Sequence, residues 1–207
     1  MPAAQVDKKQ AILEAALEEF RQKGYEAAST NQITKAAKVS KGILFHYFSD
    51  KKTLYLTLVE ECIERYYGAM TSNLSELPAD LFAALEQLAN TKIEVFKSDP
   101  VRYGFISNVF INIPEPLKAE LEVKQQQMQY HFIPLLANRL DPNQFRNGID
   151  AAQAIEFVLL SLEALITKRL SMMKDKEWNV DEIAEAIDTS PYIEMLKYGI
   201  YRKDEHV

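Results

Sequence analysis

The 207-residue chain has little cysteine, glycine or histidine, and these shortages exclude several classes of protein. Cys62 is the single cysteine, so no internal disulfide and no cysteine-based zinc cluster can form. The N-terminus also lacks a basic patch followed by an apolar run, the pattern of a secretion signal. These features favour a reducing compartment, and we expect a cytoplasmic protein.

Long hydrophobic runs are missing as well. The most apolar stretch, residues 154–166, contains Glu156 and Glu163 and is shorter than a bilayer-spanning helix. We therefore expect no membrane partner.

Sequence signatures of catalysis are also absent. The chain has no glycine-rich phosphate loop, no paired cysteine–histidine cluster and no nucleophile-elbow pattern. Its three histidines, His46, His131 and His206, lie far apart in sequence. We expect that the protein is not an enzyme and that it needs no metal or cofactor.

What the chain does have is helical periodicity and an uneven charge. Hydrophobic residues make up 47% of the sequence and recur at helical spacing without a strand pattern, which predicts an all-α protein with a sizeable core. The net charge of -6 divides into +3 for residues 1–55 and -9 for the remainder. A basic end suits contact with phosphates, although a small excess of lysine is also common on solvated faces.

The basic end contains two short predicted helices, Thr30–Ala37 and Lys41–Tyr47, joined by about three residues. An amphipathic helix over residues 8–22 precedes them and ends near Gly24. This spacing is typical of a helix-turn-helix, whose second helix enters the major groove of DNA. Three small packed helices without a nucleic-acid role are the alternative.

Several side chains support the helix boundaries and the packing. Ser29 and Gln32 are spaced as a capping box, Ser40 is a suitable N-cap, and Ser49 or Asp50 begins a long fourth helix. Gly42 keeps the start of the second short helix slim. Phe45 and Phe48 are expected in the core rather than against DNA.

The segment from residue 8 to residue 56 resembles the DNA-binding region of the TetR family of bacterial regulators. The positions that fall on the family's pattern in register are Thr30, Ile33, Ala37, Val39, Ser40, Gly42, Leu44, Phe45, Tyr47, Phe48, Lys51 and Leu54. Lys38 stands where the family usually has a glycine, and Phe45 replaces the commoner tyrosine.

The resemblance implies a helix-turn-helix domain over residues 1–50 and a larger helical effector-binding and dimerisation domain over residues 51–207. It implies phosphate contacts by Thr30, Lys41, Tyr47 and Lys51, and base contacts by Lys41, Ile43 and His46. Lys51 could instead be simply solvated. The full expected DNA-binding set is Thr30, Ser40, Lys41, Gly42, Ile43, His46, Tyr47 and Lys51.

A helix over residues 150–173 is apolar on nearly all sides and must therefore be buried on nearly all sides. A two-fold homodimer satisfies this requirement and places two recognition helices on a roughly palindromic operator of double-stranded DNA. The residues expected in the dimer interface are Phe157, Leu160, Ala164, Leu165, Ile193 and Leu196.

Bulky apolar residues with a few polar tips occupy the middle of the chain, and they line either an effector pocket or an ordinary core. The candidates for a pocket are Phe96, Tyr103, Phe110, Met128, His131 and Phe132. The hypothesis is a repressor released from its operator when a small apolar or amphipathic ligand shifts the helix over residues 50–73. An activator, or a helical interaction protein whose DNA-binding segment has lost function, remains the alternative.

Overall fold

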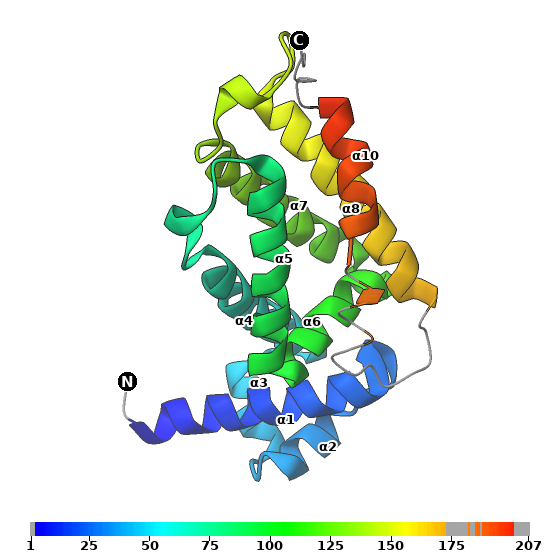
Figure 1. Ribbon diagram of the computed structural model, residues 1–207. Coiled ribbons are helices and arrows are strands. Elements are labelled where there is room, and N and C mark those ends of the chain that lie inside the picture. The colour runs from blue at the N-terminus through cyan, green and yellow to red at the C-terminus, as the bar shows by residue number, and fades with distance from the viewer. Residues whose placement is uncertain (1–2, 173–181, 183–184, 187, 201–207) are drawn as a thin grey trace, which may run out of the picture. The chain divides into compact units, whose positions relative to one another are not determined.

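The computed structural model describes residues 3–172, 182, 185, 186 and 188–200, and every regular element in these residues is a helix (Figure 1). The prediction of an all-α protein is confirmed. Within the same residues, no helix is both long and apolar enough to cross a membrane.

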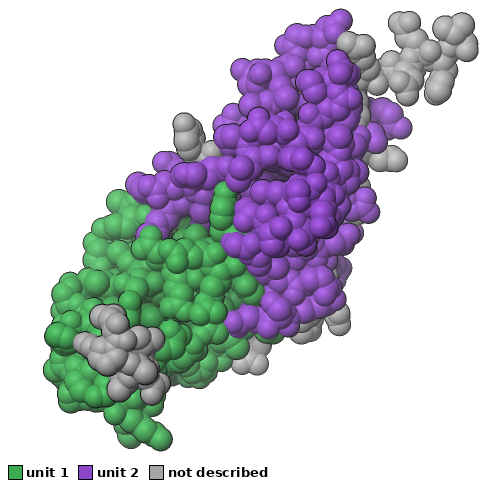
Figure 2. Space-filling view, turned by 90° about the vertical axis from the view of Figure 1, so that its left-hand side faces the viewer, with its two compact units in different colours: residues 1–67, 100–121 green, residues 68–99, 122–207 purple. Residues whose placement is uncertain are grey.

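The chain divides into two compact units, coloured separately in Figure 2. Unit 1 comprises residues 1–67 and 100–121, and unit 2 comprises residues 68–99 and 122–207. The sequence predicted a boundary at residue 50, between a helix-turn-helix domain and an effector-binding and dimerisation domain. The two packing units do not divide the chain at that residue, and the functional boundary stays a prediction.

Unit 1 holds the helix-turn-helix together with later helical segments that complete its core. Its elements are α1 (Ala3–Ala27), α2 (Thr30–Ala36), α3 (Lys41–Tyr47), most of α4 (Lys51–Thr71), α6 (Pro100–Ile111), η2 (Glu115–Leu117) and the first residues of α7 (Lys118–Ala137).

The predicted helix ends in unit 1 rest on local backbone chemistry. Gly24 has a φ of 71°, the left-handed conformation that glycine adopts at little cost, and it marks a kink near the end of α1. The carboxylate of Asp50 accepts a hydrogen bond from the backbone N–H of Thr53 at 2.7 Å and so caps α4. Each signal was visible in the sequence.

The core of unit 1 is built from the inward faces of α1 to α4 and of α6. Aromatic edge-to-face contacts connect Tyr55 of α4 to Phe20 of α1 and to Phe105 of α6, with ring centroids 4.8 and 5.8 Å apart. Leu117 and Leu121, which follow α6, are fully buried in the same cluster. The helix-turn-helix segment therefore shares its core with residues some fifty positions further along the chain.

Unit 2 contains the remaining helical elements of the residues that the structure describes. Its elements are η1 (Leu74–Glu76), α5 (Leu81–Ser98), the rest of α7, η3 (Pro142–Gln144), α8 (Ala151–Met172) and α10 (Ser190–Ile200). Asp80 caps α5 by accepting from the N–H of Ala83 at 2.9 Å. α7 continues through Pro134. The guanidinium of Arg169 on α8 lies 5.4 Å from the ring centroid of Tyr192 on α10.

Candidate nucleic-acid interface

Helix α3 is held on unit 1 by two buried side chains one turn apart. Leu44 is 0% exposed and Phe48, its C-cap residue, is 1% exposed. The hydroxyl of Ser40 accepts a hydrogen bond from the backbone N–H of Ile43 at 3.3 Å, as an N-cap does. The predicted cap is therefore confirmed, and α3 presents its remaining surface outward.

Four residues form the exposed surface of α3, and we call them the recognition face: Lys41, Gly42, Phe45 and His46. Their spacing of one, four and five positions places them on one side of a helix. The first turn of α3 contains no acidic residue, so no neighbour in that turn neutralises the positive charge of Lys41.

The other expected contact residues of α3 are less accessible. Ile43 and Tyr47 are half-buried and pack against the core of unit 1. The Tyr47 ring lies edge-to-face with the ring of His46, with centroids 5.4 Å apart. Their roles toward bases and phosphates stay predictions.

Phe45 does not lie in the core, so that expectation was wrong, whereas Phe48 does. The Phe45 side chain is 37% exposed, and the ammonium of Lys41 sits 5.8 Å from its ring centroid. Helical periodicity explains the difference, because Leu44 and Phe48 already fill the inward stripe and Phe45 lies about 100° away from Leu44. The spacing alone contained this signal.

The turn between α2 and α3 has an unusual backbone. Lys38 has a φ of 54° and is the position where the family pattern usually has a glycine. A left-handed lysine costs about 1–2 kcal/mol, which the packed unit absorbs.

The capping box expected at the start of α2 is not formed. Ser29 occupies the N-cap position, but its side chain makes no capping hydrogen bond. Its backbone N–H instead donates to the carboxylate of Glu19 at 2.9 Å, which ties α2 to α1. Thr30, a predicted phosphate contact, begins α2 and is half-buried.

Lys51 binds the chain itself. Its ammonium donates to the backbone carbonyls of Glu26 and Ala28 at 3.0 and 3.1 Å and lies 4.9 Å from the ring centroid of Tyr25. A cation at the C-terminal end of a helix satisfies carbonyls that have no partner within the helix. Lys51 therefore positions the end of α1, and its contact with phosphate stays a prediction.

Two ion pairs connect the first helices of unit 1 to its later segments. Arg102 of α6 pairs with Glu14 of α1, and Lys52 of α4 pairs with Glu120 of α7. The Lys52–Glu120 hydrogen bond raises the pKa of the lysine and lowers the pKa of the carboxyl. Because the two side chains are 45% and 39% exposed, solvent screens this pair and it adds little stability.

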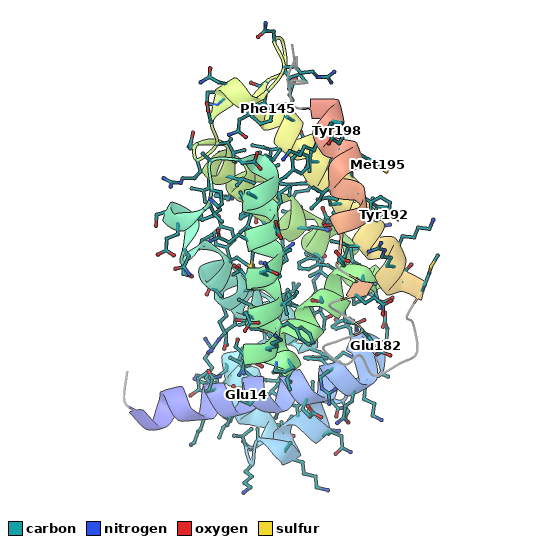
Figure 3. The ribbon with its side chains drawn as sticks, viewed as in Figure 1. Glu14, Phe145, Glu182, Tyr192, Met195 and Tyr198 are labelled. Carbon is teal, nitrogen blue, oxygen red and sulfur yellow. The ribbon has the colours of Figure 1, made fainter. Side chains whose placement is uncertain are left out.

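In unit 2, some of the residues expected in a dimer interface are exposed to solvent and others are half-buried. Phe157 and Leu160 of α8 are 58% and 50% exposed, and Ala164 on the same stripe is exposed. Leu165, Ile193 and Leu196 are half-buried. The sequence interpretation missed Met172, Met195 and Tyr198, which are more exposed still; Figure 3 labels the latter two on α10.

The expected pocket residues do not lie together in either unit. Tyr103 and Phe110 belong to unit 1, whereas the other four candidates belong to unit 2. Phe96, Met128 and Phe132 are half-buried, and His131 is exposed with its Nδ1 2.7 Å from the carbonyl oxygen of Gln127.

Two grooves described within unit 2 are lined by other side chains. One involves Gln153 and Phe157 of α8 with Met195 of α10, and the second lies along α7 and α8. The effector site therefore stays a prediction.

A short helix exposing lysine, histidine and an aromatic ring, held by a preceding helix through a tight turn, is the arrangement of a DNA-binding helix-turn-helix. Residues 12–58 match the model for bacterial regulatory proteins of the tetR family. Residues 12–58 therefore form a helix-turn-helix segment of the tetR type, and the chain is a DNA-binding transcriptional regulator.

Known proteins are similar over most of the chain. The transcriptional repressor AcnR of Corynebacterium efficiens is 27% identical over 197 residues, which cover 89% of this chain and 93% of AcnR.

Among solved structures, a TetR-family regulator from Mesorhizobium loti matches with a TM-score of 0.65 and 21% identity over 97% of this chain and 100% of its own. FadR from Bacillus subtilis, solved in complex with stearoyl-CoA, matches with a TM-score of 0.63 and 18% identity over 93% and 99% of the two chains.

Proposed function

We propose that this protein is a repressor that binds a roughly palindromic operator as a homodimer in the cytoplasm and leaves it when a small apolar or amphipathic ligand binds. Residues 1–50 contact DNA in this proposal, and residues 51–207 bind the ligand and the second protomer. The enzyme alternative has no support in the sequence.

The observation that carries the proposal is the recognition face. Lys41 and His46 project from a helix whose opposite side is fixed in a core, so their positions are set before DNA arrives. Pre-organised polar groups on a slim helix suit the major groove, where base edges display distinct donors and acceptors. The acidic remainder of the chain does not oppose this, because the charge of the interface governs phosphate contact.

Selection from a random double-stranded DNA library, followed by fluorescence anisotropy at two salt concentrations, tests DNA binding. We expect one enriched palindromic sequence whose affinity falls steeply with salt, since each phosphate contact contributes about -0.9 to the slope of log affinity against log salt. Lys41→Ala should reduce that slope by about one for each recognition helix engaged. Equal weak binding to all sequences, with the fold intact, would instead favour an interaction protein.

The homodimer is supported by the apolar surface that one protomer leaves uncovered. Phe157, Leu160 and Met172 of α8 and Met195 and Tyr198 of α10 are all at least half exposed, and α8 and α10 contact each other within unit 2. Phe157 and Met195 line one groove, and exposed apolar side chains gathered in this way mark interaction surfaces in soluble proteins. A two-fold axis would bury this surface against its own copy.

Sedimentation equilibrium of the wild type and of Leu160→Glu tests this interface. We expect a dimer for the wild type and a shift to monomer for the variant, because a glutamate would be buried without a partner. Val101→Glu is the control, since Val101 is 42% exposed on α6 in unit 1. A dimer that persists in Leu160→Glu would contradict the interface.

The ligand class is motivated by FadR of Bacillus subtilis, whose solved complex contains stearoyl-CoA and whose fold this chain shares. Titration of the protein–operator complex with fatty acyl-CoA thioesters of increasing chain length tests it. Release of the DNA at ligand concentrations that leave a non-specific DNA complex unchanged would support the proposal. Equal release of both complexes would contradict it.

A further inference from the structure

Phe45 is an exposed aromatic ring in the middle of the recognition face. It is 37% exposed, and it is absent from the side chains that pack against the core of unit 1, whereas its neighbours Ile43, Leu44 and Tyr47 belong to that cluster. One exposed apolar residue is ordinary on a protein surface. Its position on the helix that meets DNA distinguishes this one.

The ring is flanked by groups that point to a nucleic-acid partner. Lys41, one turn earlier, holds its ammonium 5.8 Å from the ring centroid. Gly42 lies on the same face and presents no side chain. The ring therefore stands beside a positive charge and next to a position where a partner can approach the backbone closely.

The chemistry of the ring limits what it can recognise. A phenylalanine side chain has no hydrogen-bond donor or acceptor, so it cannot distinguish the polar groups on base edges by hydrogen bonds. The major groove presents one apolar group, the C5-methyl of thymine. A tyrosine, the residue that the family pattern usually has here, would carry a hydroxyl at the same place.

We propose that Phe45 selects thymine at one position in each half of the operator by packing against its methyl group. This inference rests on the proposed function, because it requires α3 to enter the major groove. It adds a specificity-determining residue that acts by apolar contact beside the polar contacts of Lys41 and His46.

Replacement of thymine by uracil in the selected operator tests the inference, since it removes the methyl group and keeps the base pair. Binding of each singly substituted duplex is measured by fluorescence anisotropy. We expect about a fourfold loss at one thymine per half-site, the effect of exposing one buried methyl group, and about a fifteenfold loss when both half-sites are changed. Substitution at other thymines should change affinity little.

Variants of the recognition face assign the effect to Phe45. The quantity to compare is the affinity for the thymine operator divided by the affinity for the uracil operator. In Phe45→Ala this ratio should fall to about one. In Phe45→Leu, which keeps an apolar side chain, it should stay above one. His46→Ala is the matched control, because it removes a polar neighbour on the same face and should weaken binding without changing the ratio. Circular dichroism checks that each variant is folded.

The possible outcomes distinguish failure of the role of Phe45 from failure of the proposed function. The role of Phe45 would be overturned if binding stayed selective but no thymine-to-uracil replacement changed the affinity. It would also be overturned if Phe45→Ala left the thymine-to-uracil affinity ratio unchanged. Either result would leave the proposed function standing. An enriched operator without thymine in its half-sites would likewise overturn the role of Phe45 alone. Failure to enrich any sequence would overturn the inference and the proposed function together.

Discussion

Gly42 gives the sharpest test of the recognition face, because its packing within the chain does not require a glycine. A Cβ added there would have the Ser40 hydroxyl oxygen at 3.9 Å as its nearest neighbour, which is ordinary van der Waals contact. The backbone at Gly42 is helical and its φ is not positive. Alanine is favoured over glycine inside helices by about 0.5–1 kcal/mol. We therefore expect Gly42→Ala to stabilise the free protein by up to about that amount.

The same substitution should weaken DNA binding. If the α3 backbone approaches DNA at Gly42, the added methyl group meets the bases or the sugar–phosphate chain, and we expect at least about a tenfold loss of operator affinity, or 1.4 kcal/mol. Urea unfolding followed by circular dichroism measures the stability, and fluorescence anisotropy measures the affinity. Opposite signs in the two assays are the expected result.

Gly68 provides the matched control. It is an exposed glycine in α4 with no atom within 4 Å of an added Cβ, and it lies outside the recognition face. Gly68→Ala should stabilise the protein to a similar extent and leave operator affinity unchanged. If Gly42→Ala bound the operator as tightly as the wild type, close approach at this position would be refuted; if it were less stable, the account of its packing would be wrong.

Three further substitutions test the surroundings of the recognition face. Lys38→Asn should raise the free energy of unfolding by up to about 1 kcal/mol, because asparagine tolerates the left-handed backbone better than lysine; an unchanged or lower urea midpoint would contradict the strain. Lys51→Met should lower the free energy of unfolding by about 1.5–3 kcal/mol through the loss of charged hydrogen bonds, and it should leave the salt dependence of operator binding unchanged. Unchanged stability with a weaker salt dependence would instead assign Lys51 to a phosphate contact. The N–H of Thr53 lowers the pKa of Asp50, so its carboxylate stabilises the fold above its ordinary pKa and loses that effect as pH falls. Asp50→Asn keeps a hydrogen-bond acceptor at the cap but has no titratable carboxyl. The difference in free energy of unfolding between the wild type and this variant should therefore shrink between about pH 5 and 3. A difference that stays constant over this range would contradict a stabilising role of the ionised carboxylate.

The helices and the turn of the DNA-binding segment were predictable because their signals are local. Ser40, Asp50 and Gly24 act within a few residues of their own positions, and each predicted feature is present. The capping box failed because the alternative partner of Ser29 is Glu19, ten positions earlier, and a capping pattern does not include such a contact. The role of Lys51 at the end of α1 is non-local in the same way.

The extent of the packing unit was not predictable from local pattern. Phe105 and Leu117 are as apolar as residues of any helical core, and nothing in their spacing indicates that they complete the core around Tyr55. The expected pocket residues show the same limit, since Tyr103 and Phe96 are near in sequence but belong to different units. Periodicity predicts which face of a helix is buried, but not against which helix.

The residues that local stability does not explain lie close together. Gly42 occupies a helical position where alanine would fit, Phe45 exposes an aromatic ring to water, and Lys38 holds a left-handed backbone that favours glycine. A stable fold gains nothing from any of the three choices, and each alone is unremarkable. Natural sequences depart from local preference mainly where function requires it. Three departures within eight residues, on and beside one short helix, therefore indicate a surface shaped for a partner, and they do so independently of the likeness to known regulators.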